Sequence, residues 1–202
     1  RRQRQMCIRD RSEMTDVLGF SGYSLEEMNN YNKKLVEALL DLDNTTQLGI
    51  ANSIWIKKGF GVHDDFVSVN KKMYDAQVQE LDFASPKAPD IINGWCAGKT
   101  NNCIPKVLNE IPETARLYLL NALYFKGIWK NQFKKSDTAE EAFTNADGSK
   151  STVHMMNLRD ERFNYAENEY FSMAELPYGN EAFSMVVLLP CLLYTSDAAD
   201  DR

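Results

Sequence analysis

The chain has 202 residues and a formal net charge of −6, with 23 Lys and Arg residues against 29 Asp and Glu residues. This acidic balance excludes a general nucleic-acid binder, because such proteins present a basic surface to the phosphates. Hydrophobic residues make up 44% of the chain, yet none of its apolar runs reaches the roughly eighteen residues that a membrane span needs. The composition therefore predicts neither a nucleic acid nor a membrane as a partner.

The two ends of the chain resemble translated sequencing adaptor. Residues 1–11 begin RRQRQMCIRD and residues 191–202 begin CLLYTSDAADD, and both strings are translations of one oligonucleotide, read on opposite strands in different frames. We therefore expect 1–11 and 191–202 to be non-native, and 12–190 to be the central part of a single domain. Removing five Arg and one Asp from the first end, and three Asp and one Arg from the second, changes the net charge from −6 to −8.

The first predicted element is a helix that opens at Ser24. Glu27 follows three residues later, which is the spacing of a capping box, and leucines then recur at helical intervals up to Asp43. The next three residues, Asn44, Thr45 and Thr46, match a glycosylation sequon, although a plain loop is the simpler interpretation of so short a pattern.

Residues 47–56 are predicted to form a strand in the centre of a sheet, because both of its alternating faces are largely apolar. After it, His63, Asp64 and Asp65 allow two interpretations. They resemble the start of a metal site, but two acidic residues at the beginning of a helix also complement its dipole, and we favour that role. The sequence has only one other histidine, His154, and no Cys/His spacing typical of a metal site, so we expect no metal and no cofactor.

A further helix is predicted around Ile91, Ile92 and Trp95, ending near Thr100. Gly94 and Gly98 weaken it by roughly 1 kcal/mol each relative to Ala, so packing has to stabilise it. With the end segments set aside, the remaining cysteines are Cys96 and Cys103. On one continuous helix they would lie about 10 Å apart, too far for a disulfide, so two free thiols are favoured unless the helix ends between them.

An apolar run from Leu117 to Phe125 predicts a strand covered on both faces. Asn121 lies inside this run and needs hydrogen-bond partners if it is buried. Four more strand-like runs follow at 152–156, 162–166, 171–176 and 183–189, separated by turn signals at 145–148 and 177–180. Helices mixed with strands, followed by a series of strands, predict an α+β fold.

The order of residues from Asn121 to Phe133, NALYFKGIWKNQF, resembles the signature strand of the serpins, which are protease inhibitors. Further blocks resemble the same family in its own order: ANSIW (51–55), MYDAQVQELDF (73–83), INGW (92–95), KTN (99–101), MM (155–156), FNY (163–165), ELPY (175–178) and SMVVLLP (184–190). The resemblance implies a serpin-like α+β fold. It also assigns the family signature to Asn121, Tyr124, Phe125, Lys126, Gly127, Trp129 and Phe133.

The resemblance implies a function through a conformational change. In the family, an exposed reactive loop baits a serine or cysteine protease, and the cleaved loop inserts into the main sheet as a new strand, carrying the acylated protease with it. The positions of Asn121 and Trp129 match residues beside the gap that opens, so both are candidates for the conformational switch. An ordinary core role is the alternative for each of them.

No catalytic residues are predicted, and the protein is not expected to be an enzyme. Ser184, His154 and Asp160 have the side chains of a hydrolytic triad, but nothing in their spacing brings them together. Within the serpin resemblance, the alternative to an inhibitor of serine-type endopeptidases is a non-inhibitory serpin that acts as a carrier, a storage protein or a chaperone.

The family's reactive loop lies well beyond Pro190, so it is absent from this chain and we expect the chain itself to be inactive. The family resemblance also suggests an extracellular or secreted protein, with a cytoplasmic one as the alternative. One departure from the family pattern is Asn102-Cys103-Ile104 in place of Gly-Lys-Ile. Because Asn is the residue next best to Gly in a left-handed helix cap, we expect this departure to leave the local fold intact.

Overall fold

The computed structural model describes residues 12–159 and 162–190, so the predicted adaptor segments 1–11 and 191–202 lie outside the described residues. The chain divides into two compact units. Unit 1 includes the described residues up to Asp41 and those from Leu48 to Tyr124, whereas unit 2 includes Leu42–Gln47 and the described residues from Phe125 onward. Both units have strands and unit 1 also has three helices of eleven residues or more, which confirms the predicted α+β class.

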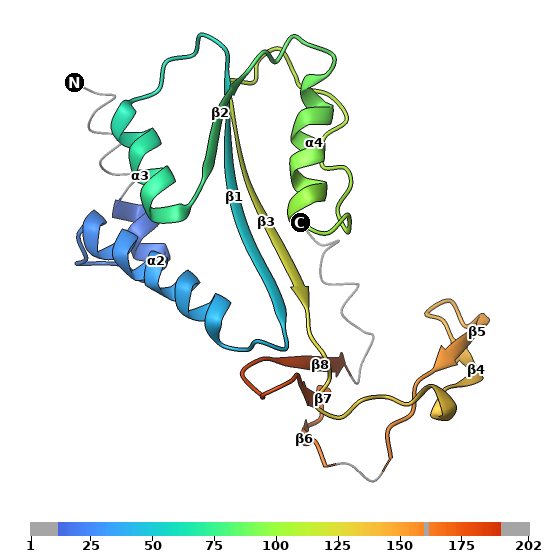
Figure 1. Cartoon of the computed structure of the whole chain (residues 1–202). Helices are drawn as coiled ribbons and strands as arrows, with labels where there is room; N and C mark the ends of the chain where they lie inside the picture. The colour runs from blue at the N-terminus through green and yellow to red at the C-terminus, as the bar shows by residue number, and fades with distance from the viewer. Residues whose placement is uncertain (1–11, 160–161, 191–202) are drawn as a thin grey trace, which may run out of the picture. The chain divides into compact units, whose positions relative to one another are not determined.

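Unit 1 is built on a three-stranded sheet with the order β2-β1-β3 (Figure 1). The central strand β1 pairs in parallel with β2, from Ser53 opposite Gln77 to Lys57 opposite Leu81. The prediction that residues 47–56 form a central strand is therefore confirmed. The elements are α2 (Leu25–Asp41), β1 (Gln47–Lys57), α3 (Asp64–Tyr74), β2 (Gln77–Leu81), α4 (Ala88–Lys99) and β3 (Leu117–Lys126).

Local signals in the sequence place the helix starts. The Ser24 Oγ accepts a hydrogen bond from the Glu27 amide at 3.2 Å, and the Glu27 carboxylate accepts from the Ser24 amide at 2.8 Å, so the capping box is confirmed. Helix α3 begins at Asp64 and has Asp64 and Asp65 in its first turn, as the dipole interpretation predicts.

Alternate side chains of β1 enter two separate apolar clusters, one on each face of the sheet. Trp55 is 1% exposed and packs with Phe83 and Ile92, and its ring meets that of Trp95 on α4 edge to face at 6.5 Å. Ile54 packs into the other cluster, together with Ile56 and Ala76. Figure 1 shows α4 on one side of the sheet and α2 and α3 on the other. The period of two in the sequence therefore decides which of the two clusters each side chain of β1 enters.

Asn93, a buried side chain on α4, holds the loop that leads toward β3. Its Nδ2 donates to the Leu108 carbonyl at 2.8 Å, and its Oδ1 accepts from the amides of Val107 and Leu108 at 2.8 and 2.9 Å. The helix ends at Lys99, and Asn101 and Asn102 just beyond it adopt φ values of 47° and 61°. The left-handed conformation predicted for Asn102 is therefore confirmed.

The two cysteines outside the end segments are both free thiols, as the sequence analysis favoured. Cys96 is buried on α4, and Cys103 is exposed just beyond the end of that helix.

Unit 2 consists mainly of a two-stranded sheet, β4-β5, and a three-stranded sheet with the order β6-β7-β8. Both are antiparallel throughout. The elements are a short 3-10 helix (Lys135–Asp137) and the strands β4 (Ala139–Thr144), β5 (Lys150–Met155), β6 (Asn164–Glu167), β7 (Phe171–Pro177) and β8 (Ser184–Pro190).

Strand β4 was not predicted, because all six of its residues are exposed and the sequence there has no apolar alternation. Pairing with β5 across the turn at 145–148 makes it a strand. That turn itself was predicted, and Gly148 adopts the positive φ of 80° that a residue without a Cβ tolerates best.

Candidate functional site

Asn121, the first switch candidate, connects β3 to the central strand of the sheet. Its Nδ2 donates to the Asn52 Oδ1 at 2.9 Å and, more weakly, to the Ala51 carbonyl at 3.5 Å. Strand β3 is an edge of the sheet within the part of the chain that the structure describes. Asn121 is therefore a side-chain link between an edge strand and its one described neighbour.

The link continues through hydrogen bonds into the two helices behind the sheet. The Asn52 Nδ2 donates to the carbonyl of Tyr74 at the end of α3, at 2.9 Å. The hydroxyl of Tyr74 in turn donates to the Oδ1 of Asn29 at 2.7 Å, and Asn29 is a buried residue of α2. A polar series thus runs from β3 through β1 and α3 to α2, so a displacement of β3 would break its first bond.

The prediction that this strand is covered on both faces is wrong for the described residues. Ala122 is 3% exposed, and Tyr118 and Leu120, which share its face, pack into the cluster beneath α4. On the other face Leu119 and Leu123 are 66% and 59% exposed, and Asn121 itself is exposed. Coverage of that face requires elements other than those described, so Asn121 meets its hydrogen-bond requirement at the surface.

The second switch candidate, Trp129, belongs to an aromatic cluster centred on Tyr178 in unit 2. The rings of Trp129 and Tyr178 stack at 4.3 Å with 13° between their planes, and Phe133 meets Trp129 edge to face at 6.1 Å. Phe125 contacts both Tyr178 and Phe183, with ring centroids 5.0 and 5.6 Å apart. Three aromatic residues of the signature are therefore held by the turn between β7 and β8.

The ring of Tyr178 also leaves no space for a side chain at Gly127. A Cβ at this position would lie 2.5 Å from the Cδ1 of Tyr178, closer than packed side chains approach. The backbone next to it is also fixed, because the Gly179 amide donates to the Ile128 carbonyl at 2.8 Å and the Lys130 amide donates to the Pro177 carbonyl at 3.0 Å. The aromatic and glycine positions of the signature thus form one packing unit with the Pro177–Tyr178 segment.

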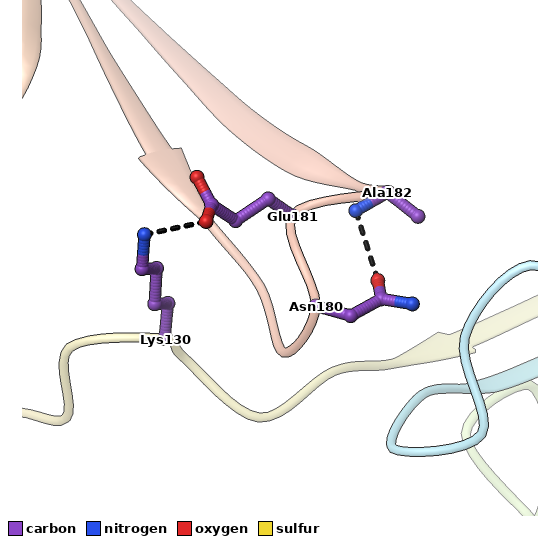
Figure 2. Close-up of polar contacts among 4 residues, drawn as sticks. All are labelled: Lys130, Asn180, Glu181 and Ala182. Carbon is purple, nitrogen blue, oxygen red and sulfur yellow. Dashed lines mark hydrogen bonds and ion pairs between the residues drawn. The ribbon is translucent and has the colours of Figure 1, made fainter.

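Polar contacts complete this junction (Figure 2). The Lys130 Nζ forms an ion pair with the Glu181 carboxylate at 2.5 Å, and the Asn180 Oδ1 accepts a hydrogen bond from the Ala182 amide at 2.9 Å. Glu181 has a positive φ of 73°, and its amide bonds the carbonyl of Tyr178. The ion pair therefore joins the signature segment to a tight turn of defined conformation.

The remaining signature residues have structural surroundings of their own. The Cβ of Tyr124 lies against Gly49 of β1, at 3.5 Å from where a glycine Cβ would stand, while Lys126 is exposed at the end of β3. The two switch candidates belong to different units and have different partners: Asn121 bonds Asn52, whereas Trp129 stacks on Tyr178.

The structure offers no support for a hydrolytic triad. Ser184 and His154 lie in different sheets, and Asp160 is outside the described residues. Hydrogen bonds from the side chains of Asn164 and Ser184 lower the pKa of Glu175 from its ordinary value, so Ser184 is a partner of a carboxylate.

The described residues contain neither a candidate metal cluster nor a candidate membrane-spanning helix. Within residues 12–159 and 162–190, no group of three or more His, Cys, Asp or Glu side chains is arranged to hold a metal ion. Within the same residues, every helix is too short or too polar to cross a membrane.

Two residues that matter here were missed by the sequence analysis. Asn52 lies in the predicted central strand on the same face as Ile50 and Ile54, and a polar residue on that face was the signal that a partner had to exist. Tyr178 was quoted only as part of the ELPY block. Its role at the centre of the aromatic cluster depends on contacts with residues about fifty positions earlier, which no local pattern reports.

Comparison with known proteins connects this geometry to a family. The family model described as serpin (serine protease inhibitor) matches residues 9–199. Iripin-3 of Ixodes ricinus is 34% identical over 190 residues, covering 89% of this chain and 47% of its own. The native state of tengpin, a thermophilic serpin, superposes with a TM-score of 0.74 at 32% identity, covering 83% of this chain and 43% of its own. Arabidopsis AtSerpin1 in its native stressed conformation has a TM-score of 0.77 at 27% identity, covering 90% and 49%.

The chain therefore spans about half the length of the curated relatives that it matches. The family match includes the signature strand, the sheet that contains this strand and the aromatic cluster around Tyr178. This chain therefore belongs to the serpin family, whose members are protease inhibitors and not enzymes.

Proposed function

We propose that residues 12–190 are the central part of a longer serpin that inhibits a serine-type endopeptidase by inserting its cleaved reactive loop into the sheet that contains β3. The observation that carries the proposal is the state of β3. It is an edge strand of the described sheet, it is paired on one side with β1, and the Asn121–Asn52 bond fastens it there.

An edge strand has free backbone N–H and C=O groups along one side, and these groups are what an added strand pairs with. Leu120 and Tyr118 pack into the cluster beneath α4, so this helix covers one face of β3 and keeps the strand in place. Within the described residues, the outer edge of β3 has no strand paired to it. The family membership adds support, because the family model that matches this chain is described as serine protease inhibitor. The proposed partner is accordingly a serine protease, with a cysteine protease as the second class.

The alternative is a non-inhibitory serpin that acts as a carrier, a storage protein or a chaperone. The β3 edge is compatible with both functions, because a sheet edge by itself does not require that a loop ever enters it. The two are distinguished by the segment before the reactive loop, since an inhibitor needs small residues there to enter a sheet.

We further propose that the protein is extracellular, with the cytoplasm as the alternative. A protease inhibitor has to be in the same compartment as its target proteases. An extracellular inhibitor would meet secreted serine proteases. Separating a culture of the source cells into medium and cell lysate, followed by detection with an antibody against residues 12–190, tests this placement.

The function itself is tested with the natural protein, from the gene read beyond the codon of Pro190. It is incubated with a panel of serine and cysteine proteases, and each mixture is analysed on a denaturing gel. A covalent complex that survives denaturation, formed at a stoichiometry near one, supports the inhibitor. Cleavage of the loop by every protease without any such complex supports the non-inhibitory alternative.

The 202-residue chain is the matched control in the same assay. We expect it to form no complex, because the family's reactive loop is predicted to lie beyond Pro190. A covalent complex between this chain and any of the proteases would overturn that expectation and would place the bait within residues 12–190.

A further inference from the structure

The turn between α2 and β1 has the sequence Asp43-Asn44-Thr45-Thr46, and its last three residues are the one Asn-x-Ser/Thr sequence in the chain. The Thr46 amide donates to the Asp43 carbonyl at 3.2 Å, which closes the turn around Asn44 and Thr45. This segment belongs to unit 2, together with the turn at Gly179 and Asn180.

Three of the four residues have structural roles in holding the turn. Asp43 is 4% exposed, and its carboxylate accepts from the Thr45 amide at 2.8 Å, from the Thr45 hydroxyl at 2.7 Å and from the Thr46 hydroxyl at 2.8 Å. Asp43 and Thr45 also lie close to Gly179, where the Cβ of a larger residue would stand 2.0 Å from the Thr45 Oγ1. The Asn180 Nδ2 also donates to the carbonyl of Leu42, just before the turn, at 2.9 Å.

Asn44 is the exception in this arrangement. It is exposed, and within the described residues its side chain makes no hydrogen bond, ion pair or ring contact. The turn therefore keeps its geometry without the Asn44 amide, and a large group attached there would extend into solvent without displacing a neighbour. Exposed surface loops are where N-linked glycans are found on secreted proteins.

We propose that Asn44 is an N-glycosylation site, an inference that rests on the extracellular location proposed above. The reaction joins the Asn44 Nδ2 to the anomeric carbon of an oligosaccharide. The bond between that carbon and the diphosphate of a lipid carrier breaks, the lipid diphosphate leaves with the electron pair, and the amide loses one proton.

The structure also indicates that the glycan is attached before the turn folds. The sequon requires a hydroxyl two residues after the Asn, and in the folded turn the Thr46 hydroxyl is bound to the buried Asp43 carboxylate. An acceptor whose hydroxyl is already engaged is a poor substrate, so the glycan is attached to the unfolded chain before this turn closes. Once the turn has closed, an unmodified Asn44 stays unmodified.

The test expresses the full 202-residue chain behind a cleavable signal peptide in eukaryotic cells, with a known glycosylation sequence fused to the C-terminus as a reporter of entry into the secretory pathway. Secreted protein is treated with peptide N-glycosidase, and the peptide that contains Asn44 is analysed by mass spectrometry. We expect a glycan on Asn44 that the enzyme removes with conversion of Asn44 to Asp. We expect its complete loss in Asn44→Gln and its retention in Thr46→Ser, which keeps the hydroxyl.

Thr46→Ala removes the sequon and also one Asp43 bond, so Asn44→Gln is the variant that separates modification from folding. A protein whose reporter is glycosylated while Asn44 remains an unmodified asparagine would overturn the proposal. Because the signal peptide is supplied, that failure says nothing about protease inhibition. A protein found only in the cytoplasm of its source would refute the proposed location. The expression test would still decide whether Asn44 can accept a glycan.

Discussion

Asn121 on β3 and Asn52 on β1, 69 positions apart in the chain, are joined side chain to side chain by a hydrogen bond of 2.9 Å. The Asn52 Nδ2 donates a hydrogen bond to the Tyr74 carbonyl, and this bond orients the Asn52 Oδ1 toward β3. The edge strand is therefore attached to the sheet by a side-chain contact in addition to the backbone ladder.

A double-mutant cycle with Asn121→Ala and Asn52→Ala measures this contact. Because Asn121 is exposed, we expect a coupling free energy of about 0.5–1 kcal/mol in urea unfolding. In the complete protein, Asn121→Ala is also expected to change the stoichiometry of inhibition, since the bond lies beside the edge where the proposed loop inserts. A lower melting temperature with unchanged inhibition kinetics would instead assign Asn121 an ordinary stabilising role.

Gly127→Ala is expected to destabilise unit 2 by roughly 1–3 kcal/mol, because the added Cβ meets a rigid tyrosine ring that the Trp129 stack holds in place. Thermal unfolding monitored by Trp fluorescence measures the loss. Gly94→Ala is the matched control. A Cβ there meets nothing within 4 Å in helix α4, so it is expected to stabilise the protein by up to about 1 kcal/mol. Equal effects of the two substitutions would contradict the packing argument.

Asp43 is expected to make stability depend on acidity. Hydrogen bonds from the Thr45 side chain, followed by those from the Thr45 amide, the Thr46 hydroxyl and the Asn180 backbone, hold the pKa of this carboxyl below its ordinary value of 3.8 in spite of burial. A lowered pKa means that the charged form stabilises the folded state. The contribution is therefore complete above about pH 4, the value in the unfolded chain, and is lost as the pH falls through the folded-state pKa.

The variant Asp43→Asn tests this dependence without changing the shape of the side chain. At pH 7 it should melt at a lower temperature than the parent chain, and the difference should shrink as the pH is lowered below about 4. Measuring the difference between the two proteins cancels the contributions of other carboxyls such as Glu27, whose pKa is lowered by the Ser24 hydroxyl and amide. A difference in melting temperature that stays constant with pH would show that the charge of Asp43 does not stabilise the turn.

Asn93→Ala is expected to cost about 1–3 kcal/mol, because it leaves two partly buried amides, those of Val107 and Leu108, and the Leu108 carbonyl without their side-chain partner. Hydrogen exchange at the Val107 and Leu108 amides should accelerate. Asn93→Asp keeps an acceptor for both amides, but it replaces the donor to the Leu108 carbonyl with a charged oxygen. It should therefore fall between the parent and the Ala variant in the exchange rate of the Val107 and Leu108 amides. Protected amides in Asn93→Ala would contradict this assignment.

The open edge of β3 predicts self-association of the 202-residue chain. Leu119 and Leu123 are exposed beside backbone groups that no described strand pairs with, and an apolar sheet edge of this kind is a template for another chain. Leu123→Lys should shift sedimentation toward the monomer in a concentration series. Val187→Lys on β8, whose residues are also exposed, is the control for association through the other unit. A parent chain that stays monomeric at high concentration would refute the prediction.

Sequence patterns predicted the elements whose energetics are local. The Ser24–Glu27 capping box, the alternation in β1, the turn at 145–148 and the asparagine cap at Asn102 all depend on residues a few positions apart, and each is present in the structure. Strand β4 was missed because its six residues are exposed, so only the hydrogen bonds to β5 distinguish it from a polar loop. The coverage predicted for both faces of β3 was wrong because a run of apolar residues does not state which neighbours cover it.

The amino-acid order by itself determined the family and the positions of the signature, because both are properties of residues read in sequence. The tertiary structure decided what those residues touch: Asn121 meets Asn52, and Trp129 and Gly127 meet Tyr178. Contacts of this kind join segments about 50 to 70 positions apart, and they form only when the sheets and turns bring those segments together. Local preference cannot specify them, since the free energy that selects each partner comes from packing and hydrogen bonds that exist only in the folded chain.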